Sequence, residues 1–197
     1  EGKGPLDIVI IQMVRLFRAG EPVKMSKRSG NFVTLAEVVE EVGKDAVRFM
    51  MLTRRADAPL DFDFAKVKEQ SKDNPVFYVQ YAHARIQSLL RKAGEGGMAP
   101  AEVDALEGRL DETEMALLKL AAQFPRIVRL AAEAHEPHRV VFFLESLAAA
   151  FHANYNRGND DPALRVIRPD AADVTGARLA LCRAVGTVIA SGLTLMG

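Results

Sequence analysis

The chain has 197 residues, which is room for one domain or two small ones with a buried core. Lys and Arg total 26, as do Asp and Glu, so the net charge gives no sign of nucleic-acid binding, although a local basic face could still bind it. A single cysteine excludes a disulfide framework, and apolar runs such as Ile8–Ile11 are too short to cross a membrane, so we expect a cytoplasmic protein. The sequence begins without Met, which suggests a fragment of a longer protein.

The first segment is rich in β-branched and aromatic residues. Leu6–Phe17 is apolar without strict alternation, which predicts a strand buried on both faces. A turn at Arg18–Glu21 would let Pro22–Met25 pair back as a short return strand. We therefore predict a β-hairpin whose open end carries the next segment.

That next segment, Lys24–Gly30, reads KMSKRSG and contains three cations, two hydroxyls, a glycine and no acid. On composition alone a solvated turn is the better interpretation, because such charge runs are common on surfaces. The alternative is a phosphate clamp, in which Lys24 and Lys27 stabilise charge on a leaving pyrophosphate and Ser26 donates to an oxygen. The spacing excludes a Walker loop.

Two short helices and one extended stretch follow. Thr34 and Glu37 form a capping box for the first helix, and Gly43 ends it. Asp45 is expected to begin the second. Leu60–Phe64 alternates strictly and is either a strand or an extended elbow, with Asp61 and Asp63 on one solvated face.

From Asn74 onward the sequence predicts an α-helical bundle. Asn74 is a strong helix start because proline follows it. The expected helices cover about 76–92, 111–123, 125–135, 137–157 and 174–195. Gly94–Gly97 is expected to be a flexible linker, and Gly158–Pro162 a loop. The four histidines, His83, His135, His138 and His152, have no Cys or acid at metal-ligand spacing, so we predict no metal site.

The first long helix carries an aromatic and polar run. Tyr78 and Tyr81 lie three apart and share a face, Arg85 lies about one turn beyond, and Gln80 lies on a neighbouring polar face with His83. One interpretation is that the tyrosines are core residues with their hydroxyls at the rim. The other is a stacking platform for unpaired bases. The remaining tyrosine, Tyr155, is predicted to lie near a helix end, where plain capping is an alternative.

These motifs together resemble those of a known family. Lys24–Gly30 resembles the KMSKS signature of class I aminoacyl-tRNA synthetases, and Gly43–Phe49 resembles the G-x-D-x-x-R-[FY] stretch that follows it. Asn74–Arg85, which reads NPVFYVQYAHAR, is similar to the corresponding run of the arginyl-tRNA synthetase family. Asp173–Leu195 resembles the last helix of a DALR-type anticodon-binding domain. The resemblance covers essentially the whole chain.

The resemblance implies a mainly α fold in three parts. These are residues 1–33, a β-hairpin edge of a catalytic domain, residues 34–73, a helical connector, and residues 74–197, the anticodon-binding domain. It also implies that the parent protein uses ATP with Mg²⁺ to activate arginine and transfers it to tRNA(Arg). The parent is expected to be a monomer without membrane contact. The His-Ile-Gly-His signature does not occur, so we expect this chain alone to be inactive and to bind no ATP.

The resemblance also assigns roles to individual residues. Lys24 and Lys27 are implied as catalytic, and Lys24, Met25, Ser26 and Lys27 as ATP-binding. The implied tRNA-binding residues are Tyr78, Gln80, Tyr81, Arg85 and Tyr155. Two alternatives stay open, namely another class I synthetase such as the cysteinyl enzyme, and a helical protein-interaction module without any role in RNA binding. The interaction module would bury its tyrosines in the core.

Overall fold

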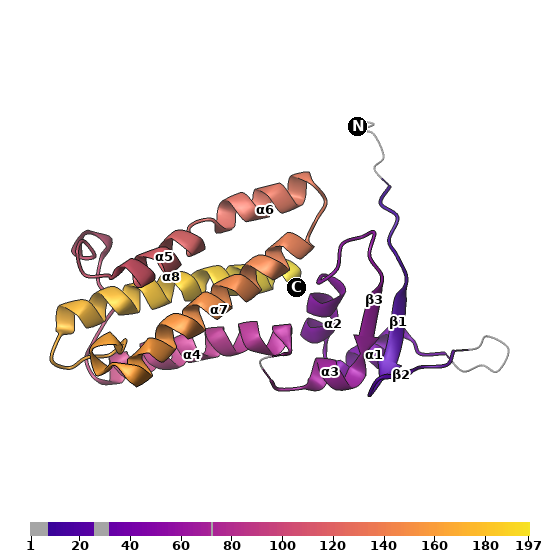
Figure 1. Cartoon of the computed structure of the whole chain (residues 1–197), viewed down its shortest axis with the longest axis horizontal. Helices are drawn as coiled ribbons and strands as arrows, with labels where there is room; N and C mark the ends of the chain where they lie inside the picture. Colours follow the sequence, from indigo (N-terminus) through magenta and orange to yellow (C-terminus); the bar gives the residue numbers. More distant parts are fainter. Residues whose placement is uncertain (1–7, 26–31, 72) are drawn as a thin grey trace. The chain divides into compact units, whose positions relative to one another are not determined.

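The computed structural model describes residues 8–25, 32–71 and 73–197. The chain divides into two compact units, with the boundary in the sequence between Glu69 and Gln70 (Figure 1). The predicted division into three parts stays a prediction. The two units are treated separately below.

The amino-terminal unit contains a small sheet with helices beside it. Strands β1 (Val14–Arg18), β2 (Glu21–Pro22) and β3 (Leu60–Asp63) are ordered β2-β1-β3. β1 is antiparallel to β2 and parallel to β3, with Val14 opposite Leu60. The helices are α1 (Leu35–Val42), α2 (Lys44–Met51) and α3 (Phe64–Lys68). The structure thus contains the predicted hairpin, with a return strand shorter than expected.

The prediction of a strand buried on both faces is wrong for the start of this segment. Ile8–Met13 lies outside β1 and its side chains are exposed, as are those of Arg15 and Arg18 within the strand. The reason is that the core of this unit covers one side of β1 only, where Val14 and Leu16 pack. Apolar composition alone did not reveal which elements would cover the strand.

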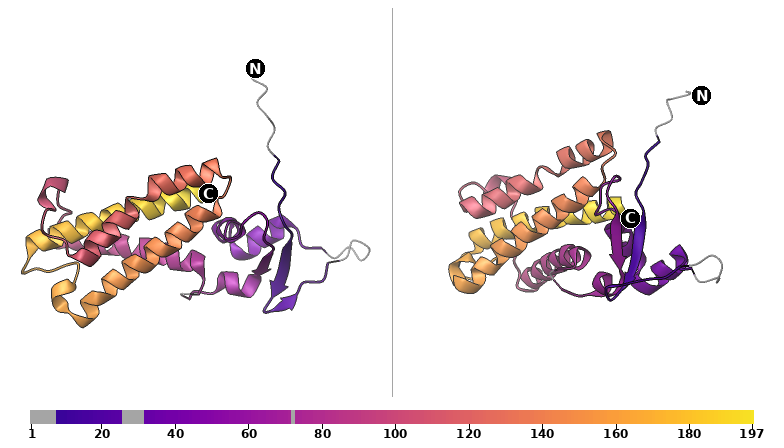
Figure 2. Two further views of the ribbon diagram at one scale, coloured as in Figure 1. Left: turned by 45° about the horizontal axis from the view of Figure 1, so that its top comes forward. Right: turned by 45° about the vertical axis from the view of Figure 1, so that its right-hand side comes forward.

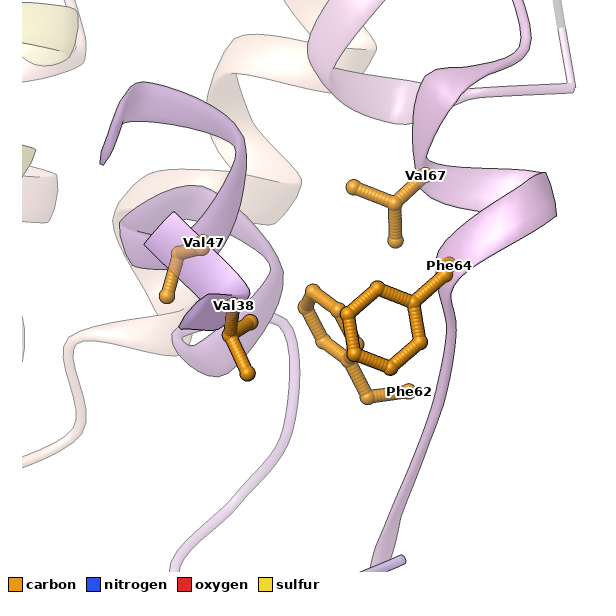
Figure 3. Close-up of a cluster of buried hydrophobic side chains, with 5 residues drawn as sticks. All are labelled: Val38, Val47, Phe62, Phe64 and Val67. Carbon is orange, nitrogen blue, oxygen red and sulfur yellow. The ribbon is translucent and has the colours of Figure 1, made fainter. Parts of the chain in front are cut away.

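The core of the amino-terminal unit consists of five buried side chains from four elements (Figure 3). They are Val38 of α1, Val47 of α2, Phe62 of β3, and Phe64 and Val67 of α3. The rings of Phe62 and Phe64 meet edge to face with their centroids 5.5 Å apart, a favourable geometry for aromatic pairs. The capping box at Thr34 and Glu37 is present and begins α1 as predicted.

Asp63 is buried, which corrects the prediction that it shares a solvated face with Asp61. Its carboxylate accepts hydrogen bonds from the backbone N–H groups of Ala19, Gly20 and Ala65 at 3.1, 2.8 and 2.9 Å. Ala19 and Gly20 both have positive φ, so this tight turn presents its N–H groups to one acceptor. Asp61 is exposed and pairs with Arg15.

The carboxyl-terminal unit is a bundle of helices, as predicted. It comprises α4 (Pro75–Glu95), α5 (Glu112–Ala121), α6 (Phe124–Glu133), α7 (His138–Asp160) and α8 (Ala172–Met196). α4, α7 and α8 pack against one another, α5 packs on α7 and α8, and α6 packs on α7 (Figure 2). The mainly α fold class is confirmed.

Side-chain caps set two of these helix starts. Asn74 accepts hydrogen bonds from the amides of Val76 and Phe77, and Asp111 forms a capping box with Glu114. α8 is long and apolar enough to span a membrane by composition, but half of its apolar window is buried inside the bundle. Packing against α4, α5 and α7 accounts for that composition.

The loop predicted at Gly158–Pro162 begins later than expected. α7 continues to Asp160, and Gly158 is a buried helical residue. A β-carbon on Gly158 would lie 3.0 Å from the Cα of Arg165, so the glycine lets the following segment pack against the helix. Gly158 permits close packing inside the helix, so the prediction that it begins a loop is wrong.

Candidate functional site

Only half of the predicted phosphate clamp lies in the described part of the chain. Lys24 and Met25 follow β2 and are exposed, while Ser26 and Lys27 lie outside the described residues. The structure therefore adds no geometry for phosphate binding by this loop, and the roles of these four residues stay predictions.

The other predicted site is assembled where α4 packs on α7. Tyr78, Tyr81 and Arg85 lie at intervals of three and four on α4, and His152 and Tyr155 lie three apart on α7. These five residues, named here the tyrosine–arginine cluster, touch across the helix pair. Tyr81 is 42% exposed, while Tyr78, Arg85 and Tyr155 are half-buried.

Arg85 holds the cluster together. Its guanidinium carbon lies 4.5 Å from the ring centroid of Tyr81 and 4.5 Å from that of Tyr155. Its Nη2 donates a hydrogen bond of 2.5 Å to the Tyr81 hydroxyl. The planar cation favours contact with the electron-rich faces of both rings. A tyrosine from each helix is thereby fixed against one cation.

His152 lies beneath the two tyrosines of α4. Its ring centroid is 4.7 Å from that of Tyr78 and 5.5 Å from that of Tyr81, and the Tyr81 ring is nearly parallel to it. Burial lowers the pKa of His152, the hydrogen bond with the Tyr78 carbonyl opposes this shift, and the charge of Arg85 adds to it. The net shift of the His152 pKa is downward, which favours the neutral imidazole.

A pocket of about 570 Å³ opens beside the cluster. α4, the end of α7 and the segment after it line this pocket with Tyr81, Ala84, Arg85, Ser88, Leu89, Lys92, Tyr155, Gly158, Asn159, Arg165, Val166 and Ile167. Three of these side chains are cationic, and none of the lining residues is acidic. The pocket thus combines aromatic faces with positive charge.

The segment after α7 forms one rim of the pocket, and side chains of α5 and α8 hold this rim in place. Arg178 of α8 donates to the carbonyl oxygens of Ala163 and Arg165, both at 2.8 Å, and pairs with Glu114 of α5 at 2.6 Å. The Arg178 and Glu114 side chains are only 8% and 2% exposed. Thr175 donates to and accepts from the backbone of Arg168. These contacts fix the backbone that carries Arg165.

The structure brings together most, but not all, of the residues predicted to contact RNA. Tyr78, Tyr81, Arg85 and Tyr155 meet in the cluster, whereas Gln80 is exposed and does not line the pocket. Sequence reasoning missed Lys92 and Arg165. Lys92 lies seven residues after Arg85 and therefore on the same helix face, a signal that could have found it. No local pattern indicates Arg165.

The chemistry of this site suits an unpaired base and its phosphates. Aromatic rings stack on bases of any sequence, and nearby cations attract the backbone. In the described chain no group of three His, Cys, Asp or Glu residues could hold a metal ion. Burial raises the pKa of the free Cys182 thiol to about 12, which makes it a poor nucleophile.

The comparisons with known proteins agree with this chemistry. Residues 79–197 match the family described as the DALR anticodon binding domain. Over its full length the chain is 62% identical to an arginine–tRNA ligase from Parvibaculum lavamentivorans, of which it covers 35%. It is 60% identical over 98% of its length to an arginine–tRNA ligase from Novosphingobium aromaticivorans, of which it covers 33%.

A solved structure shows the same similarity. The arginyl-tRNA synthetase of Thermus thermophilus superposes with a TM-score of 0.70 at 29% identity, covering 94% of this chain and 33% of that one. The chain thus spans about a third of the length of the curated relatives it matches.

Proposed function

Because the chain belongs to the DALR anticodon-binding domain family, we propose that it is the tRNA-reading part of an arginine–tRNA ligase. In this proposal the carboxyl-terminal unit binds the anticodon loop of tRNA(Arg). The parent enzyme activates arginine with ATP and Mg²⁺ and then transfers it to the tRNA, as a monomer in the cytoplasm. Similarity to arginine–tRNA ligases over the whole chain supports the choice of arginine.

The observation that carries the RNA-binding proposal is the pocket beside the tyrosine–arginine cluster. Tyr81 is 42% exposed although Phe77, His152 and Arg85 pack on its ring, Tyr155 stands across Arg85 from it, and the pocket wall contains cations without acids. A protein-interaction module with core tyrosines would bury the Tyr81 ring instead. The geometry therefore favours a base that contacts the exposed part of the Tyr81 ring, with its phosphates near Lys92 and Arg165.

The role proposed for the first unit rests on sequence. Lys24 and Lys27 would stabilise the phosphates of ATP as arginyl-adenylate forms, and Met25 and Ser26 would lie near the nucleotide. The similarity to arginine–tRNA ligases supports this assignment. In the whole enzyme, Lys27→Ala is expected to slow ATP–pyrophosphate exchange while tRNA affinity is kept.

Binding of tRNA by the 197-residue chain tests the RNA-binding proposal. We expect Tyr81→Ala to weaken the affinity for tRNA(Arg) about tenfold at fixed salt, because a contact between a base and an aromatic ring contributes roughly 1–3 kcal/mol. Phe142→Ala is the matched control, since Phe142 of α7 is 48% exposed and is not part of the cluster. Unchanged affinity of the Tyr81 variant, or equal affinity of the unaltered chain for tRNA(Cys), would count against the proposal.

A further inference from the structure

His152 contacts Arg85 and Tyr78 through its two ring nitrogens. Nη1 of Arg85 lies 3.1 Å from Nδ1, and the backbone oxygen of Tyr78 lies 3.4 Å from Nε2. Guanidinium nitrogens only donate, so Nδ1 must be the unprotonated nitrogen, and the ring proton must lie on Nε2, facing the Tyr78 carbonyl. The tautomer of the neutral ring is thus set by its two neighbours.

Among the described residues, the partners of Arg85 are all uncharged. Its guanidinium contacts the Tyr81 hydroxyl, the rings of Tyr81 and Tyr155, and Nδ1 of His152. In the described part of the chain, Arg85 forms no ion pair. Arg157, five residues beyond His152 on the same helix, is instead paired with Asp111 at 2.6 Å.

We propose that His152 is a positioning residue for RNA binding: it orients Arg85 between Tyr81 and Tyr155 while leaving its positive charge free for a phosphate. The inference rests on the proposed function of this site. A carboxylate at the same place would orient Arg85 equally well, but it would neutralise the cation and repel the RNA backbone. A neutral acceptor orients Arg85 without neutralising its charge.

Two substitutions of nearly equal shape separate orientation from charge. In His152→Asn, the amide oxygen can take the place of Nδ1, so Arg85 stays oriented and charged. In His152→Asp, Arg85 stays oriented but is paired with an acid. We expect His152→Asn to bind tRNA(Arg) within about threefold of the unaltered chain and His152→Asp to bind at least about tenfold more weakly.

The salt dependence of tRNA binding is a measurement that would not change if His152 only stabilised the fold. One phosphate contact fewer reduces the slope of log affinity against log salt by about 0.7 to 0.9. This reduction is expected for His152→Asp and not for His152→Asn. Equal affinities and equal slopes for the two variants would overturn the inference.

A double-mutant cycle tests whether His152 acts through Arg85. His152→Leu alone should weaken binding about tenfold, but it should add little in an Arg85→Gln background. Additive losses would overturn the inference. His138→Asn is the control, because His138 is also buried on α7 and packs on Phe142 away from the cluster.

Failure of the proposed function looks different from failure of this inference. If the unaltered chain shows no preference for tRNA(Arg) over tRNA(Cys), the proposed function fails and the inference with it. If the unaltered chain prefers tRNA(Arg) but the two isosteric variants bind alike, only the inference fails. Thermal unfolding of each variant identifies any loss of binding that comes from loss of fold.

Discussion

The ion pair between Glu114 and Arg178 makes a specific prediction about stability. Glu114→Gln removes the charge that compensates a guanidinium buried between α5 and α8. It also weakens the capping box at the start of α5, where Glu114 accepts from the amide of Asp111 at 2.9 Å. The substitution changes shape very little, so charge and hydrogen bonding account for the effect.

The expected magnitude follows from burial. Removing one partner of a buried pair typically costs about 3–5 kcal/mol, because the other charge stays in a poorly solvated site. The two carbonyl oxygens at Ala163 and Arg165 continue to accept from Arg178 and soften the loss, so we expect the lower end, about 3 kcal/mol. For a unit of this size, that corresponds to a decrease in Tm of roughly 10 °C.

Urea denaturation of the 197-residue chain measures this loss, with helix circular dichroism as the signal. The matched control is Glu95→Gln, which breaks the exposed pair with Arg91, whose side chains are 69% and 63% exposed. Exposed pairs one helical turn apart are worth roughly 0.3–0.5 kcal/mol, so this control should scarcely move the midpoint. A loss below about 1 kcal/mol for Glu114→Gln would refute the reasoning from burial.

Three further predictions follow from single contacts. Gly158→Val should lower the Tm and also weaken tRNA(Arg) binding, because the valine side chain would clash with the backbone of Arg165. A lower Tm with unchanged affinity would contradict a role of the Arg165 segment in RNA binding. The pKa of His152 is lowered on folding, so the unfolded chain binds a proton at higher pH than the folded chain does. The free energy of unfolding should therefore fall as the pH drops below about 6.5. His152→Asn should remove that part of the pH dependence, as measured by urea titration. Asp63→Asn should destabilise the amino-terminal unit by roughly 1–3 kcal/mol, seen as faster hydrogen exchange at Ala19 and Gly20, because an amide offers one acceptor oxygen in place of two.

Features that depend on neighbours in sequence could be predicted. The caps at Thr34, Asn74 and Asp111 each involve residues within three positions, and the structure contains all three. The shared face of Tyr81 and Arg85 follows from helix periodicity in the same way. Such signals need no knowledge of the tertiary fold, which is why helix starts and the α4 half of the site could be read directly.

Features that depend on distant partners could not be predicted. Asp63 is buried because it accepts from a turn 43 residues earlier, and His152 meets Arg85 across 67 residues. Arg165 reaches the pocket because Gly158 permits close packing and Arg178 holds the rim from behind. In each case the local pattern, an alternating strand or a glycine near a helix end, favoured a different and simpler interpretation.

The zero net charge of the chain shows how composition can conceal a binding site. Many basic residues of the carboxyl-terminal unit are paired with acids, including Arg91, Arg109, Arg157, Arg168 and Arg178. The pocket cations Arg85, Lys92 and Arg165 form no ion pair in the described chain, although the formal charges sum to zero. What matters for an anionic ligand is which cations lack an acidic partner, and the fold gathers three of them around two tyrosines. Among the described residues no acid offsets the charge of Arg85, because the side chain that orients it from α7 is a histidine that accepts through Nδ1.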